Sequence, residues 1–140
     1  MKRNLFFLLT VVAACTLLLS CKKDKNDSDE NLPALTSVVG YWVGKYGVKD
    51  NEPNFDYAFL IKADSTLIVY SQSADTASAK KAPGVWTFDI NTKKFTTYYA
   101  YSQDERYSTT GSLNHRSLTG TWGIWLDNTG GGKYAVEFKK

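Results

Sequence analysis

Residues 84–126 read GVWTFDINTKKFTTYYAYSQDERYSTTGSLNHRSLTGTWGIWL, and four runs rich in aromatic and β-branched residues are separated there by three short polar clusters. Large side chains at every second position predict strands, and the polar clusters predict turns. We predict strands over residues 84–89, 94–101, 106–113 and 117–126. Because connections this short join antiparallel neighbours, the stretch indicates an up-and-down meander.

The same pattern continues on both sides of this stretch. Further strands are predicted over residues 38–47, 55–62, 66–72 and 133–139. The expected fold is therefore all-β, an eight-stranded antiparallel up-and-down barrel, since closure removes the edges that a flat sheet would expose. A β-sandwich is the alternative, but it needs crossing connections, and only the polar loop 73–83 is long enough for one.

Proline and glycine mark the predicted turns. Pro33, Pro53 and Pro83 all fall outside the predicted strands, which suits a residue without a backbone N–H. Residues 127–132 (DNTGGG) are expected to form the turn before the last strand.

The overall composition favours one small domain. The chain has 140 residues, 17 of them basic and 14 acidic, and this balance gives no reason to expect nucleic acid as a partner. Two cysteines are too few for a disulfide framework. An aromatic content of 14%, with nine tyrosines, suits strands better than helices.

The N-terminus has the organisation of an export signal. Lys2 and Arg3 precede the uncharged residues 5–19, which are too few to span a bilayer comfortably. Residues 18–21 (LLSC) resemble a bacterial lipobox, which implies cleavage after residue 20 and acylation of Cys21 by chains such as palmitate. Two or three acyl chains would hold the protein on a membrane stably.

The residues after Cys21 are expected to form a tether. Residues 22–31 (KKDKNDSDEN) contain seven charged side chains and no apolar ones, so we assign residues 21–35 to a lipidated, disordered linker and residues 36–140 to the barrel. The start of the tether resembles those of many Bacteroidota lipoproteins. This likeness implies an outer-membrane location, on either the periplasmic or the cell-surface side.

Two glycine–tryptophan motifs resemble those of small ligand-binding barrels. Residues 40–42 (GYW) resemble the Gly-x-Trp signature of the lipocalins, in which the Trp closes one end of the barrel, and residues 120–123 (GTWG) are similar to late strands of this group. Lipocalins usually place an Arg from a late strand on that Trp. Here the arginines of the domain are Arg106 and Arg116, and neither lies in the predicted last strand.

The aromatic side chains supply the candidate ligand-binding residues. A cleft lined by aromatic faces and hydroxyls suits a small, largely apolar ligand, and the same rings would equally serve as core. The candidates are Trp42, Trp86, Tyr99, Tyr101 and Trp122.

Trp125 is a candidate for contact with a partner protein. Strict alternation over residues 117–126 places Trp122, Ile124 and Leu126 inside the barrel and Trp125 on its outer surface. An exposed Trp suits a contact with an envelope protein or the membrane, although a bulge or the N-terminal segment could equally cover it.

Catalytic and metal-binding residues are scarce. His115, the only histidine, is predicted in a turn, and the barrel contains no cysteine, so no nucleophilic triad, metal site or cofactor is expected. The sequence therefore predicts a non-enzymatic lipoprotein that binds a small apolar ligand, or alternatively a protein–protein interaction or inhibitor module of the cell envelope.

Overall fold

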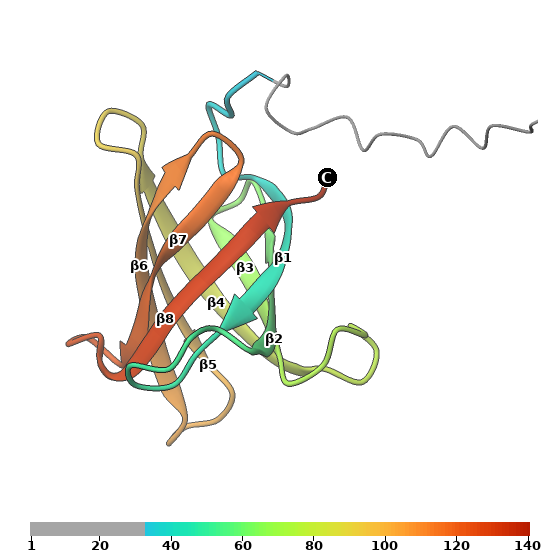
Figure 1. Ribbon diagram of the computed structural model, residues 1–140, viewed down its shortest axis with the longest axis vertical. Helices are drawn as coiled ribbons and strands as arrows, with labels where there is room; N and C mark the ends of the chain where they lie inside the picture. The colour runs from blue at the N-terminus through green and yellow to red at the C-terminus, as the bar shows by residue number, and fades with distance from the viewer. Residues whose placement is uncertain (1–32) are drawn as a thin grey trace, which may run out of the picture. The chain divides into compact units, whose positions relative to one another are not determined.

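Eight strands follow one another along residues 33–140, the part of the chain that the computed structural model describes (Figure 1). They are β1 (Gly40–Tyr46), β2 (Phe55–Ile61), β3 (Thr66–Ser71), β4 (Lys80–Asp89), β5 (Lys94–Ala100), β6 (Arg106–Asn114), β7 (Ser117–Ile124) and β8 (Thr129–Phe138). They form one closed antiparallel barrel, so the predicted fold is confirmed. The predicted signal segment 1–20, Cys21 and the tether as far as residue 32 lie outside the described residues.

The barrel is closed by the pairing of β8 with β1. Trp42 lies opposite Phe138, and Tyr46 lies opposite Tyr134. All other neighbours are consecutive in the chain, which is the up-and-down order of a lipocalin-like architecture. Each strand of the described barrel therefore has two hydrogen-bonded neighbours, and no sheet edge is left exposed.

Two-residue alternation decides which side chains fill the barrel. On β2, Tyr57, Phe59 and Ile61 are all buried. The centroid of the Phe59 ring lies 6.0 Å from that of Phe95 and 5.7 Å from that of Tyr134. Side chains from facing strands thus meet across the middle of the barrel, as its narrow interior requires.

The start of β4 differs from the prediction, which placed residues 80–83 in a loop. The strand begins at Lys80, and Pro83 lies within it, opposite Ile68 of β3. Pairing of β4 with β5 begins only at Gly84. Pro83 therefore has a ladder partner on one side alone, and a strand position of this kind tolerates a residue without an N–H.

The end of β7 also differs, because a register shift lies between Trp122 and Ile124. A bulge adds one residue to a strand and so reverses the faces of the residues that follow it. Ile124, the last residue of β7, was predicted inside and is 58% exposed. Leu126, also predicted inside, lies in the β7–β8 turn with a positive φ of 67° and is 69% exposed. The glycines at 130–132, predicted as a turn, belong to β8.

One end of the barrel is covered by the segment that leads into β1. The N–H of Leu35 donates to the carbonyl of His115, and the side chain of Leu35 packs against the core. Val38 is fully buried, and its carbonyl accepts a hydrogen bond of 2.8 Å from the indole N–H of Trp42. We call this the closed end; the lead-in and the C-terminus both lie there in Figure 1.

An arginine also contributes to the closed end. The Arg116 guanidinium lies 4.7 Å from the centroid of the Phe138 ring, and that ring packs edge-on against Trp42 at 5.2 Å. The ring of Phe138 therefore lies between the Arg116 guanidinium and the ring of Trp42.

Candidate functional site

A pocket of about 110 Å³ lies at the opposite, open end of the barrel. The strands that line it are β1 to β7, and the connections at residues 47–54, 72–79, 101–105 and 125–128 lie at this end of the barrel. Its aromatic lining comprises Tyr46, Tyr57, Tyr99, Tyr101, Tyr107 and Trp122. Its other lining residues are Ser71, Gln72, Lys80 and Glu105.

Two pairs of hydroxyl groups lie in the wall of the pocket. The hydroxyl oxygens of Tyr57 and Tyr99 are 2.7 Å apart, and those of Ser71 and Tyr101 are 2.6 Å apart. Both distances are those of good O–H···O hydrogen bonds. The four side chains point inward from β2, β3 and the end of β5, so these bonds join facing parts of the barrel.

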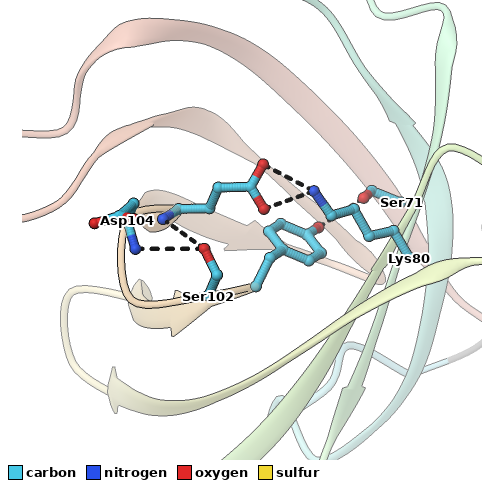
Figure 2. A network of polar contacts seen from close by, with 6 residues as sticks. Ser71, Lys80, Ser102 and Asp104 are labelled. Carbon is cyan, nitrogen blue, oxygen red and sulfur yellow. Dashed lines mark hydrogen bonds and ion pairs between the residues drawn. The ribbon is translucent and has the colours of Figure 1, made fainter.

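An ion pair lies beside these hydroxyls. The Lys80 ammonium donates to both carboxylate oxygens of Glu105, at 2.9 and 2.7 Å, and lies 4.7 Å from the centroid of the Tyr101 ring. Figure 2 shows Lys80 and Ser71 on one side of this network and the β5–β6 turn, with Ser102 and Asp104, on the other. Since both charged side chains are partly exposed, the pair contributes little to stability, and its importance lies in neutralising the pocket.

The β5–β6 turn holds Glu105 in place through Ser102. The Ser102 hydroxyl oxygen accepts hydrogen bonds from the backbone N–H groups of Asp104 and Glu105, at 3.3 and 3.1 Å (Figure 2). A serine that bonds the backbone two and three residues later stabilises a tight turn. Glu105 is thereby presented toward Lys80.

Trp122 forms part of the rim. Its indole N–H donates to the carbonyl of Gly47 at 2.8 Å, and its ring lies 5.5 Å from Tyr46 in an edge-on arrangement. A hydrogen bond at one edge and a ring contact at another leave this side chain little freedom to rotate.

Burial keeps the tyrosine hydroxyls of this end protonated. It raises the pKa of Tyr57 and Tyr99 well above 10.0 and that of Tyr101 to about 12, although the hydrogen bond from Ser71 partly opposes the rise for Tyr101. Burial likewise raises the pKa of Tyr134. These groups are therefore neutral donors at any physiological pH.

The raised pKa values predict unfolding at alkaline pH. Below pH 10.0 the stabilisation from these four tyrosines is complete; above it the unfolded chain releases protons that the folded chain keeps, so stability falls as the pH approaches the folded pKa values. Ultraviolet absorbance of tyrosinate, recorded with circular dichroism, should show these tyrosines ionising only as the barrel unfolds. Ionisation of all nine tyrosines near pH 10 in a folded barrel would contradict this.

The predicted ligand-binding residues separate into two groups. Tyr99, Tyr101 and Trp122 line the pocket. Trp42 does not, because it is fully buried at the closed end. Trp86 does not either: its indole N–H donates to the carbonyl of Lys62 at 2.9 Å, and its ring packs near Phe95. Trp42 is a core residue, and Trp86 is a partly buried residue packed against the core.

Several lining residues were not among the candidates. Tyr46, Tyr57 and Tyr107 lie at the same end of the barrel as Tyr99 and Tyr101, because the C-terminal ends of β1 and β5 meet the N-terminal ends of β2 and β6 there. The position of these tyrosines near the predicted turns at that end was the available signal. Nothing in the sequence pairs Lys80 with Glu105, which are 25 residues apart.

Trp125 lies on the outer surface. Its ring centroid is 5.4 Å from that of Tyr98, and the Arg106 guanidinium lies 5.9 Å from it. Trp125 also lines a shallow groove with Pro83 and Ala100. The outer face of β5 and its neighbours is thus partly covered by this side chain.

His115, the only histidine of the sequence, lies in the connection between β6 and β7. His115 has a positive φ of 54° in the β6–β7 turn and contributes its backbone carbonyl to the closed end. Among residues 33–140, no group of three or more His, Cys, Asp and Glu side chains is arranged to hold a metal ion. No helix in that range is long and apolar enough to cross a membrane.

Comparisons with protein-family models, with curated proteins and with solved structures find no match for this chain.

Proposed function

We propose that this protein binds a small, largely apolar ligand in the pocket at the open end of the barrel and performs no chemistry on it. The observation that carries the proposal is the pocket, where six aromatic side chains surround space that no side chain occupies. Protein interiors are normally packed with few voids larger than a water molecule. A concave space of this kind, with ring faces beside hydroxyl groups and an ion pair, is a candidate ligand site.

The volume of the pocket limits the size of the ligand. A buried cavity of roughly 150 Å³ accepts benzene, so the 110 Å³ here suits one ring, with any remainder of the ligand extending through the open end. The polar part of its wall includes the two hydroxyl pairs, which join Tyr99 and Tyr101 to Tyr57 and Ser71. The ligand is therefore an apolar ring with a polar edge.

We further propose that the barrel is displayed from the outer membrane on a lipid anchor at Cys21. Support for the anchor comes from the sequence, in which a basic start, an uncharged segment and LLSC precede a charged tether. The first described residues enter the barrel at its closed end. The pocket therefore lies at the opposite end of the barrel from the first described residues.

Native mass spectrometry tests the binding function on two matched tryptophan variants. The full-length lipoprotein, extracted from its own membrane, is expected to carry a discrete additional mass beyond the anchor. Trp122→Ala removes a ring of the pocket and is expected to weaken binding at least about tenfold, because it deletes one wall of the site. Trp125→Ala removes the same side chain from the outer surface and should leave the additional mass unchanged.

Thermal unfolding of both variants controls for misfolding. A wild-type protein with a bare mass, or equal retention of the ligand by two folded variants, would contradict the binding function.

A second candidate function is contact with an envelope protein through the β7–β8 connection. The observation that favours it is the exposure of Ile124 and Leu126, the residues on either side of Trp125. Apolar side chains grouped on a surface suit a partner contact. The Trp125→Ala variant would then lose co-purification with that protein while its thermal midpoint stayed the same.

A further inference from the structure

The hydroxyl groups of the pocket offer more protons than the protein itself accepts. Each hydroxyl carries one proton, and each of the two hydroxyl pairs uses one proton in its internal bond. One proton therefore remains in the Tyr57–Tyr99 pair and one in the Ser71–Tyr101 pair. Both pairs line the pocket, so these protons are available to whatever occupies it.

Among the described residues, no acceptor group in the wall of the pocket forms a hydrogen bond with these two protons. Both carboxylate oxygens of Glu105 accept from Lys80. Among the described residues, neither hydroxyl pair has another hydrogen-bond partner. Water satisfies such groups in an empty pocket, but a ligand that displaces the water must replace its hydrogen bonds or leave buried donors unsatisfied.

The charges of the pocket are balanced within it. Lys80 and Glu105 are the two charged side chains of the lining, and they neutralise each other. An anionic ligand would have to displace Glu105 from Lys80, and a cationic ligand would have to displace Lys80 from Glu105. Either ligand would lose its hydration without gaining a free counter-charge.

We infer, resting on the proposed function, that the ligand is a neutral single-ring molecule that carries hydrogen-bond acceptors on the edge facing the two hydroxyl pairs. Ring nitrogen atoms or a ring carbonyl have this chemistry. The aromatic walls bind the faces of the ring, and the hydroxyl protons select its edge. Selection by hydroxyl donors distinguishes rings of equal size, which the shape of the pocket cannot do.

Pyridine and benzene provide the first test, because they match in size and differ in one acceptor atom. At neutral pH pyridine is uncharged, and binding to the full-length protein can be measured for both by ligand-observed nuclear magnetic resonance. We expect pyridine to bind about tenfold more tightly than benzene, a difference typical of one hydrogen bond to a buried group. A purely apolar site would give the opposite order, because benzene leaves water more readily.

Benzamide and benzoate test the charge. Both carry a carbonyl oxygen on one ring, and only benzoate is anionic at neutral pH. Benzamide is expected to bind about tenfold or more tightly than benzoate. Tighter binding of benzoate would overturn the inference that the ligand is neutral.

Variants that lack the hydroxyl groups test whether these groups cause the preference for pyridine over benzene. A variant that combines Tyr57→Phe, Ser71→Ala, Tyr99→Phe and Tyr101→Phe removes both hydroxyl pairs and keeps the three rings. It should abolish the preference for pyridine, while benzene binds as before or more tightly. Tyr98→Phe removes a hydroxyl from the outer face of β5 and should leave the preference intact. A preference that survives in the folded fourfold variant would overturn the assignment. If that variant unfolds, Ser71→Ala combined with Tyr101→Phe removes one whole pair, and an unchanged preference there would overturn the assignment of that pair.

The outcomes separate this inference from the function on which it rests. If benzene binds more tightly than pyridine, the pocket binds rings and the acceptor inference fails. If none of these rings binds, the proposed function fails together with the inference.

Discussion

Trp42→Ala is expected to lower the free energy of unfolding by about 3–5 kcal/mol, the range measured when a buried large aromatic side chain is truncated. The ring is fully buried at the closed end, where it packs on Phe138. Its removal leaves a cavity and takes away the N–H that bonds the carbonyl of Val38. Since Val38 belongs to the lead-in, the cover of the closed end should loosen as well.

Urea denaturation of the full-length protein measures this loss, with Trp125→Ala as the matched control. Trp125 contacts Tyr98 and Arg106 on the outer surface, so its truncation should cost about 1 kcal/mol or less. Equal destabilisation by the two substitutions would show that Trp42 does not hold the closed end. Binding at the open end should survive in Trp42→Ala under conditions where that variant is folded.

Gly120→Ala is expected to destabilise the barrel by about 3 kcal/mol, at the upper end of the usual cost of overpacking. A methyl group on Gly120 would lie 2.0 Å from the carbonyl oxygen of Thr110 and 2.5 Å from the Cα of Gly111. All of these atoms are backbone of the neighbouring β6 strand. The substitution can be accommodated only by moving the β6–β7 ladder, in which Gly111 lies opposite Gly120.

Thr119→Ala is the control for this glycine. Thr119 is the preceding residue on β7 and its side chain is exposed, so its loss should cost no more than about 1 kcal/mol through strand propensity. Thermal and urea unfolding of both variants give the comparison. If Gly120→Ala were no more destabilising than Thr119→Ala, the close approach of β6 and β7 at this point would not constrain the barrel.

The strands were predictable where local pattern and barrel pairing agree. Alternation on β2 and the short turns between later strands were sufficient for the number of strands and their antiparallel order. Prediction failed at Pro83 and at residues 130–132, because proline and glycine have turn propensities that the ladder of neighbouring strands overrides. It also failed after Trp122, since alternation contains no sign of a bulge.

The site was predictable only in part, for a geometric reason. Alternation indicates whether a side chain faces inward, and Trp42, Trp86, Tyr99 and Trp122 all do so. It does not indicate the height of a residue along the barrel axis, which depends on the register between strands. Trp42 and Trp122 both face inward, but Trp42 lies at the closed end of the barrel and Trp122 at the rim of the open end. Lys80 and Glu105 contact each other because they lie at the same level along the barrel axis.

The ladder between β1 and β8 has a consequence for how the chain folds. The first strand of the barrel obtains its second neighbour from the last, so the ring cannot be completed until almost the entire domain has been synthesised. Closing so long a loop is entropically costly, and topologies dominated by such distant pairings fold slowly. Until that moment both terminal strands present unpaired backbone groups, and nascent chains at this stage are most at risk of associating with one another.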